Sequence, residues 1–394
     1  MPDKKVRCLY ITFNGLLDPL GQSQVLPYIY DLANAGYDFD LISLEKSRSR
    51  EAIDNLRNDL NARGIAWYRL KYFKFFTLGM LINIFQTFLL SFYLNLSKGI
   101  KIVHCRAYPP MFSVLPTKRL FGAKVIFDMR GFWPENLVDS GRIKPDSTHY
   151  KILKFLEKIS IRVSDWVVTL TPESEEIVKE KFNYTGLRTT WMPTCVDEEK
   201  FDVSGTNDFI NKFVLVYSGS LWSFYDVSAM ADFFKVLKKK IKDAHFLILG
   251  NNEIEKLGEL FDRKNIKKGD YTVLSLDSKD VPKYLKSSNL AVAFIYNYYS
   301  EKAAFPTKVS EYLAAGLPVA ISTQCGYLKD IIISNKVGVV LDKFDNDSLE
   351  AAIDNLILIS KDDSASCRSK MVAERYLSKS KCINKYLEIY KSLR

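Results

Sequence analysis

Lys308 and Glu311 are the residues whose types and spacing point most directly to chemistry. They lie in the stretch FPTKVSEYLAAGLPVAIS (305–322), about one helical turn apart. The ammonium group of a lysine carries a full positive charge that suits a phosphate. An ionised glutamate only accepts hydrogen bonds, so it suits the hydroxyls of a sugar or a ribose. The pair therefore predicts a site that binds a phosphate beside sugar or ribose hydroxyls.

The pattern around these two residues predicts the helix that would hold them. The Pro306–Thr307 pair is typical of a helix start, and one apolar face then follows at Val309, Tyr312 and Leu313. Gly316 ends the helix, and a short buried strand begins at Val319. The free N–H groups and the positive dipole end of the helix would also attract a phosphate. An ordinary amphipathic helix without a ligand remains the alternative.

The same stretch resembles the donor-site signature of the retaining glycosyltransferases of family 4, a large family with the GT-B fold. That signature has two glutamates separated by seven residues, which include Gly-Phe-Gly, and it ends in Gly-x-Pro-Val. The sequence keeps Phe305, Glu311 and the run GLPV (316–319). It differs at the first glutamate, where Ala303 stands, and at both glycines. The Pro-Thr-Lys variant resembles the branch that makes bacterial surface polysaccharides.

A second group of polar residues follows two predicted strands of the N-terminal half, 102–106 and 125–131. His104 lies on the first strand, and Asp128 and Arg130 come at the end of the second. Such strand ends line the ligand crevice of open α/β sheets, where carboxylates suit hydroxyls and a guanidinium suits phosphate. The continuation DMRGFWPENL, which contains Glu135, resembles the RDLWPE segment of the same branch. The resemblance implies catalytic roles around the acceptor and leaving group for Asp128, Arg130, Glu135 and His104.

Two structural interpretations of this group stay open. Asp128 and Arg130 would also be explained by an ion pair that holds a loop. His104 would also be explained as a neutral histidine in the core at the end of a strand.

The resemblance assigns further residues to the two substrates. On the donor side, besides Lys308 and Glu311, these are Ser218, Gly219, Ser220, Gly250, Leu276, Phe305, Pro306 and Thr307. On the acceptor side they are Gly21, Gln22 and Arg106. Ser220 stands where the family has an arginine, so Lys308 and the helix amides would carry more of the diphosphate charge. Gly21 and Gln22 lie in a predicted polar loop, 14–24, which could also be a connection without function.

The remaining chain predicts the architecture. A length of 394 residues fits two domains, and 47% hydrophobic with 26% charged residues is typical of a soluble globular protein. Predicted strands alternate with helices, which indicates α/β domains with parallel sheets. We expect an N-terminal acceptor-binding domain (1–197), a nucleotide-sugar-binding domain (198–370) and a C-terminal helix that returns to the first domain (371–394). The resemblance implies the GT-B fold, in which two Rossmann-like domains face a central cleft.

The net charge of +10 is concentrated in one interval. No acidic residue lies between Asp59 and Asp128, whereas ten basic residues do: Arg63, Arg69, Lys71, Lys74, Lys98, Lys101, Arg106, Lys118, Arg119 and Lys124. Because aromatic and aliphatic residues are interspersed, the 60–127 region predicts contact with an anionic membrane surface. No nucleic-acid-binding module is recognisable, so nucleic acid is not an expected partner.

Within this interval, the apolar stretch 78–96 is about as long as a membrane-spanning helix. Polar residues interrupt it at Asn83, Gln86, Thr87, Ser91 and Asn95. These interruptions favour a helix packed on the sheet, with peripheral membrane contact, over a spanning segment.

Together these features predict a retaining glycosyltransferase, transferring a hexosyl or N-acetylhexosaminyl group. It would move the sugar from a nucleotide-sugar, by default a UDP-sugar, to a lipid-linked or oligosaccharide acceptor in bacterial surface glycan synthesis. The six cysteines form no CxxC pair and only three histidines occur, so we expect no metal site. The resemblance implies no cofactor beyond the nucleotide-sugar. The N-terminus lacks a signal-peptide pattern, which predicts a cytoplasmic protein, peripheral on the inner face of the membrane.

Two alternatives stay open. One is a UDP-sugar epimerase on the same fold. The other is a degenerate, non-catalytic scaffold at the membrane, which the alanine at 303 and the serine at 220 motivate.

Overall fold

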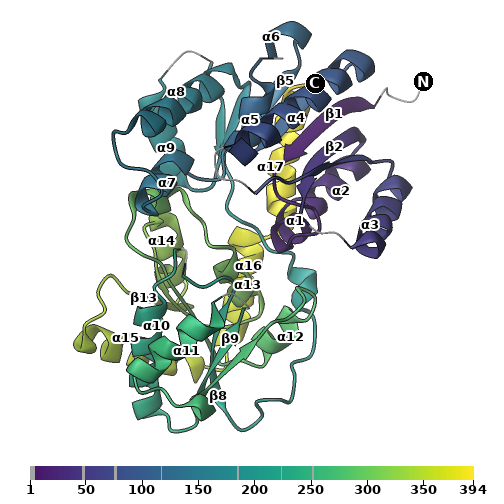
Figure 1. Cartoon of the computed structure of the whole chain (residues 1–394). Coiled ribbons are helices and arrows are strands. Elements are labelled where there is room, and N and C mark those ends of the chain that lie inside the picture. The colour runs from purple at the N-terminus through teal and green to yellow at the C-terminus, as the bar shows by residue number, and fades with distance from the viewer. Residues whose placement is uncertain are drawn as a thin grey trace. The chain divides into compact units, whose positions relative to one another are not determined.

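The computed structural model describes residues 5–46, 49–74, 78–116, 118–183, 186–222, 224–250 and 253–394. The chain divides into two units, Met1–Pro193 with Ser380–Arg394, and Thr194–Lys379 (Figure 1). The sequence predicts a domain boundary after residue 197 and a separate C-terminal segment, 371–394. In the structure that segment is divided, with its residues from Ser380 onward in the first unit.

The first unit is built on a parallel sheet whose seven described strands have the order β3-β2-β1-β4-β5-β6-β7. The strands are β1 (Val6–Thr12), β2 (Tyr37–Glu45), β3 (Ala66–Lys71), β4 (Ile102–Arg106), β5 (Lys124–Asp128), β6 (Trp166–Thr169) and β7 (Thr189–Trp191). β4 is buried along its whole length and β1 from its third residue onward, as expected for central strands of a sheet covered by helices on both faces.

The helices of the first unit connect these parallel strands. They are α1 (Pro19–Gln24), α2 (Leu26–Asn34), α3 (Arg50–Ala62), α4 (Leu78–Lys98), α5 (Tyr108–Val114), α6 (Lys118–Phe121), α7 (Trp133–Asp139), α8 (Thr148–Val163), α9 (Pro172–Lys181) and α17 (Lys379–Ser392). The predicted loop 14–24 is therefore wrong in its second half, which is α1. Gly21 permits the tight turn before it, since a Cβ there would lie 2.1 Å from the carbonyl oxygen of Gly15.

The second unit contains a parallel sheet with the order β10-β9-β8-β11-β12-β13 among its described strands. These are β8 (Phe213–Ser218), β9 (Ala244–Leu249), β10 (Tyr271–Leu274), β11 (Leu290–Phe294), β12 (Val319–Ser322) and β13 (Gly338–Val340). The order reverses between β8 and β11, which is the position where doubly wound sheets bind nucleotides.

Helices α10 (Val227–Lys240), α11 (Ile254–Arg263), α12 (Val281–Lys286), α13 (Thr307–Ala314), α14 (Gly326–Ser334), α15 (Asn346–Ser360) and α16 (Ala365–Leu377) complete the second unit. Its core holds an aromatic group of fully buried phenylalanines at 233, 234, 246, 261 and 294. The predicted α/β class, with two domains that each contain a parallel sheet, is confirmed.

Helix α4 buries its polar face and exposes apolar side chains on the opposite face. Asn83, Thr87 and Ser91 are fully buried, whereas Leu81 and Phe85 are 64% and 60% exposed. The helix packs chiefly on α5, rather than on the sheet as the sequence suggested. Among the described helices, α4 alone has the length and hydropathy needed to cross a membrane, and 33% of its most apolar window is buried.

Candidate functional site

In the second unit, the ends of β8 and β9 bring Gly219 and Gly250 together at the reversal of strand order. Gly219 has a φ of +117°, which L side chains rarely adopt. A Cβ on Gly250 would lie 2.6 Å from the carbonyl oxygen of Gly219. Both positions therefore require glycine for the backbone to run this close to the candidate site.

Helix α13 is fixed against this strand end. The Tyr312 hydroxyl accepts a hydrogen bond from the backbone N–H of Ser218 at 2.7 Å. On the other side, the hydroxyl of Thr194 donates to the carbonyl of Phe305 at 2.9 Å. Pro306 occupies the N-cap position and Thr307 is the first residue of the helix, and no side chain of the described residues caps it. The first N–H groups of α13 thus remain available for an anion.

Lys308 is buried beside these groups, with its ammonium nitrogen 3.8 Å from the ring centroid of Tyr217 and 3.4 Å from that of Tyr225. No hydrogen-bond acceptor among the described residues reaches this nitrogen. A Cβ on Gly219 would lie 3.1 Å from it. Burial lowers the pKa of Lys308 well below its usual value, and the charge of Glu311 opposes that shift.

Two carboxylates approach the same tyrosine. Burial raises the pKa of Glu311 to about 7, while the charges of Lys308 and Lys200 act in the opposite direction. Glu301, in the short helix η3 (Tyr299–Ala303), is also buried. Burial raises the pKa of Tyr225, and the charges of Glu301 and Glu311 raise it further.

Sequence reasoning missed Glu301, Tyr217 and Tyr225. For Glu301 a signal existed, because an acidic residue lies two positions before Ala303, where the family signature has its first glutamate. No local pattern marks Tyr217 or Tyr225, since tyrosines are common in protein interiors.

The other predicted donor residues are Ser220, Phe305, Pro306 and Leu276. Ser220 is exposed, and its carbonyl accepts a hydrogen bond from the Tyr217 hydroxyl at 2.5 Å. Phe305 and Pro306 are buried in front of α13, whereas Leu276 lies two residues beyond the end of β10. The structure thus brings Ser218, Gly219, Gly250 and Lys308 together, and no described contact connects Leu276 with them.

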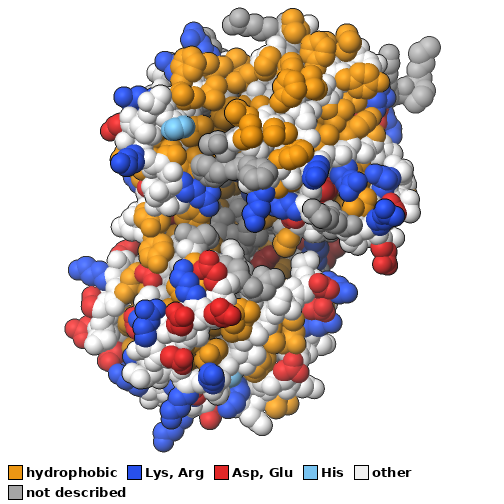
Figure 2. Space-filling view, viewed as in Figure 1, with side chains coloured by type: hydrophobic (Ala, Val, Ile, Leu, Met, Phe, Trp, Pro, Cys, Tyr) orange, Lys and Arg blue, Asp and Glu red, His pale blue; other side chains and the backbone are white. Residues whose placement is uncertain are grey.

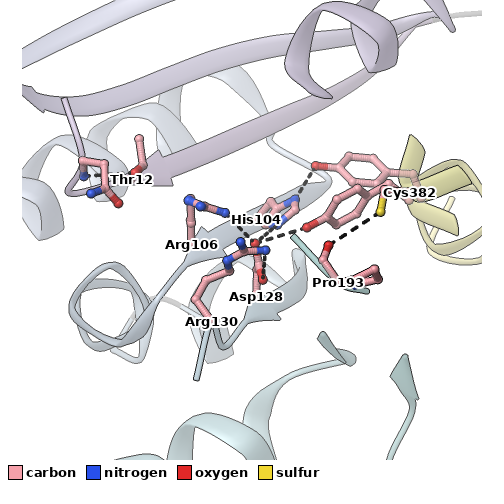
Figure 3. Close-up of polar contacts among 10 residues, drawn as sticks. Thr12, His104, Arg106, Asp128, Arg130, Pro193 and Cys382 are labelled. Atoms are coloured by element: carbon pink, nitrogen blue, oxygen red, sulfur yellow. Dashed lines mark hydrogen bonds and ion pairs between the residues drawn. The ribbon is translucent and has the colours of Figure 1, made fainter. Parts of the chain in front are cut away.

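In the first unit, Asp128 is the centre of a buried polar group at the ends of β4 and β5 (Figure 3). Its Oδ2 lies 3.3 Å from a guanidinium nitrogen of Arg106 and accepts a hydrogen bond from the Tyr386 hydroxyl at 3.1 Å. Its Oδ1 lies 3.8 Å from Arg130. Arg130 has a φ of +57°, a strained backbone region for a residue with a side chain. Its side chain is 14% exposed, the most accessible of these charged groups.

His104 belongs to the same group but is shielded by α17. Its Nδ1 is 2.9 Å from the hydroxyl of Tyr390, and its Nε2 is 4.0 Å from Asp128. Burial lowers the pKa of His104 to about 4, against the opposing charge of Asp128. The imidazole is therefore neutral at pH 7, so one ring nitrogen donates a hydrogen bond and the other accepts one, and the ring carries no charge.

Glu135 faces a different set of residues. On α7 it accepts hydrogen bonds from Lys154 at 2.8 Å and from the Tyr150 hydroxyl at 3.3 Å, both on α8. Lys154 also pairs with Glu157. The sequence grouped Glu135 with Asp128 and Arg130, but no contact among the described residues connects it with either.

Gln22 and Gly21 hold the turn between β1 and α1. The side-chain amide of Gln22 donates to the carbonyl of Leu16 at 2.7 Å. Arg106, the third predicted acceptor residue, is almost fully buried beside Asp128. Arg106 and Gly21 are thus buried parts of the first unit, whereas Gln22 is partly exposed.

Comparison with known proteins shows which family model and which folds the chain resembles. Residues 198–370 match the sequence model of the family described as glycosyl transferases group 1. Among proteins with curated functions, none matches the sequence.

Solved structures show the fold of the whole chain. Sucrose-phosphate synthase from Thermosynechococcus elongatus has a TM-score of 0.76 at 13% identity, covering 99% of each chain. Anabaena Alr3699/HepE in complex with UDP-glucose has a TM-score of 0.71 at 12% identity, covering 98% of this chain and 99% of that one. WaaG, a glycosyltransferase involved in lipopolysaccharide biosynthesis, has a TM-score of 0.66 at 13% identity over 97% and 99%. The chain thus has the fold of GT-B glycosyltransferases, and its second unit matches the group 1 glycosyl transferases.

Proposed function

We propose that this protein is a retaining glycosyltransferase that uses a nucleotide-sugar, by default a UDP-sugar. The proposal depends on the placement of Lys308 and Glu311 at the start of α13, inside the segment that matches group 1 glycosyl transferases. A buried cation and uncapped N–H groups suit a diphosphate, and the two carboxylates suit hydroxyls. The Anabaena structure of the same fold contains UDP-glucose, which supports this class of donor.

In the proposed reaction, the bond between the anomeric carbon and the diphosphate oxygen breaks while an acceptor hydroxyl joins the sugar and passes its proton to the departing diphosphate. Negative charge grows on the departing nucleoside diphosphate. Lys308 and the α13 amides would stabilise that charge, so we propose transfer of a hexosyl or N-acetylhexosaminyl group without a bound metal or another cofactor. We assign no protein nucleophile.

We place the acceptor on the first unit. Arg130 is the most accessible cation of the Asp128 group, and its guanidinium lies 3.8 Å from Asp128. The acceptor is a lipid-linked or oligosaccharide glycan of bacterial surface synthesis, and the enzyme is peripheral on the cytoplasmic face of the membrane. The fold shared with WaaG and the exposed apolar face of α4 support this part of the proposal.

The test is calorimetric titration with UDP, GDP, ADP and dTDP and their sugars, followed by transfer assays. We expect one nucleotide to bind selectively, and Lys308→Ala and Glu311→Ala to lose nearly all transfer activity while remaining folded. Lys279→Ala, an exposed lysine of the same unit, is the matched control. Near-normal turnover in both site variants would remove the assignment.

The same titrations separate the two competing functions. An epimerase would convert its nucleotide-sugar without an acceptor, whereas a transferase releases the nucleotide only when an acceptor is present. A scaffold would bind no nucleotide-sugar even at millimolar concentration. The buried Glu301 weakens the argument for a scaffold, because it supplies a carboxylate near the position where the signature lacks one.

A further inference from the structure

A basic pocket of about 760 Å³ opens in the first unit, away from the Asp128 group. It lies at the C-terminal ends of β2 and the edge strand β3, and its lining is Glu45, Lys46, Arg69, Leu70, Lys71, Tyr72 and Lys74. β1 and β4 separate these strands from β5 in the sheet. None of these residues belongs to the sites described above.

Glu45 and Lys46 have polar partners in the first unit, whereas the other three charged residues of the pocket form no described ion pair. The carboxylate of Glu45 is directed inward, where it accepts hydrogen bonds from the N–H of Leu16 at 2.6 Å and the hydroxyl of Ser43 at 2.7 Å. Lys46 pairs with Asp18. Arg69, Lys71 and Lys74 form no ion pair with a described residue, and the chain has no acidic residue from 60 to 127. Three cations without described ion pairs, beside one carboxylate that is directed inward, suit a ligand with several negative charges.

The pocket is attached directly to α4. The side-chain amide of Asn83 forms two hydrogen bonds with the backbone of Phe73, both at 3.0 Å. The amide of Gln86 donates to the carbonyl of Lys71 at 2.8 Å. The polar side of α4 thus binds the backbone of the segment that supplies the cations. These contacts explain why the polar side of the helix is buried.

The opposite side of α4 is an apolar ridge. It consists of Leu78, Leu81, Phe85, Leu89, Tyr93 and Leu96, which are 51–68% exposed and recur every three or four residues. Figure 2 shows apolar side chains gathered over a broad part of the first unit. Exposed large residues on α6 and α8 add to them at Leu120, Ile152 and Phe155. Soluble monomers rarely expose an apolar area of this kind, so it indicates contact with a partner.

We propose that this pocket binds the phosphates of a membrane lipid with a diphosphate head group while the apolar ridge enters the bilayer interface. The polar side of α4 is bound within the protein, so the helix lies in the plane of the membrane instead of crossing it. Basic flanks with an apolar face are what an anionic membrane attracts. The choice of a diphosphate lipid rests on the proposed function, because it would be the carrier of the acceptor glycan.

Vesicle binding without nucleotide tests the pocket. We expect phosphatidylcholine vesicles that contain polyprenyl diphosphate to bind at least tenfold more tightly than vesicles in which phosphatidylglycerol gives the same surface charge. Arg69→Gln/Lys71→Gln/Lys74→Gln should abolish this preference. Lys239→Gln/Lys242→Gln/Lys268→Gln, which removes the same charge from the second unit, should keep it. A preference that survives in the pocket variant overturns the proposal.

A second measurement tests the ridge. At high salt, where charge attraction is screened, Leu81→Gln/Phe85→Gln/Leu89→Gln should lose at least tenfold in binding to both kinds of vesicle. The control, Ile254→Gln/Ile333→Gln/Leu358→Gln, removes equally exposed residues from the second unit and should bind normally. A spin label at Phe85→Cys in a Cys367→Ser background should become accessible to oxygen, and protected from a polar relaxation agent, on vesicle binding. An unchanged label, or a ridge that instead joins two copies of the chain in solution, contradicts the proposal.

These results are separable from the proposed function. Loss of vesicle selectivity together with normal nucleotide binding would refute the lipid site alone. Selective vesicle binding without any nucleotide binding would refute the donor assignment and leave the lipid site intact.

Discussion

The ammonium nitrogen of Lys308 lies 3.4 Å from the centre of the Tyr225 ring, at the first turn of α13. The ring attracts the cation but offers it no hydrogen-bond acceptor. No other described residue hydrogen-bonds this nitrogen, and the side chain is buried. Lys308 is therefore held without a full counter-charge, a position in which the phosphates of a ligand would compete strongly for it.

Binding of UDP should take up protons through Lys308. A diphosphate favours the charged ammonium, so the lowered pKa of Lys308 rises on binding. The affinity should consequently fall as the pH increases above the pKa of Lys308 in the free protein. Calorimetric titrations in Tris and in PIPES, which differ in ionisation enthalpy, measure the proton count.

Glu311 titrates near neutral pH, so the proton uptake is best isolated in the Glu311→Gln variant. There we expect uptake to persist, and to vanish when Lys308→Gln is added. Equal binding enthalpies in both buffers for Glu311→Gln would show that Lys308 is already fully charged.

Glu311→Gln should stabilise the protein at pH 8 and have little effect at pH 5. The pKa of Glu311 is raised to about 7 in the folded chain, so between its unfolded value and 7 the folded state binds more protons than the unfolded state. Stability therefore decreases as the pH rises through this window, by about 3 kcal/mol, and a neutral amide removes that loss. Thermal unfolding midpoints at the two pH values measure the difference. An equal shift at both would mean that the change is one of packing.

Gly219→Ala should weaken nucleotide binding at least tenfold. Its φ of +117° strains any L side chain, and the added Cβ would meet the ammonium group of Lys308. Gly258→Ala on α11 is the matched control, because nothing lies within 4 Å of a Cβ there. We expect the control to bind UDP normally and to melt at the same or a higher temperature. Comparable affinity in the two variants would separate Gly219 from the donor site.

Glu301→Gln should impair transfer without weakening the binding of the free nucleotide. If this buried carboxylate receives a sugar hydroxyl, its loss costs a charged hydrogen bond, roughly 1.5–3 kcal/mol or about 10- to 100-fold in kcat/KM. Titration with UDP alone and with the UDP-sugar separates the two contacts. A variant that loses affinity for UDP itself would place Glu301 beside the nucleotide.

Much of the second unit could be predicted because its signals are local. The helix at Thr307–Ala314 follows from its spacing of apolar residues, its starting proline and the glycine after it. The burial of Lys308 could not be predicted in this way. It depends on Tyr217 and Tyr225, and on a glycine at 219, residues that only the folded sheet brings beside α13.

The same distinction explains the misplaced residues of the first unit. In the sequence, the polar residues of α4 interrupt an apolar stretch without an evident partner. In the structure, Asn83 and Gln86 bind the backbone at Phe73 and Lys71. Similarly, Glu135 follows Arg130 closely in sequence, but Lys154 on α8 determines where its carboxylate points. Contacts between side chains on different helices or strands leave no periodic pattern in the local sequence.

Tyr386→Phe should destabilise the first unit more than Tyr390→Phe. The Tyr386 hydroxyl donates to Asp128, a fully buried carboxylate that would be left short of a donor, and such a loss costs about 1–3 kcal/mol. Tyr390 bonds a neutral imidazole, whose desolvation cost is smaller. Thermal unfolding of both variants at pH 7 ranks the two losses. Because Asp128 also lies beside Arg130, at 3.8 Å, Tyr386→Phe should in addition lower the transfer rate, whereas Tyr390→Phe should not. An equal effect of both changes on the rate would indicate that α17 acts only by packing against the sheet.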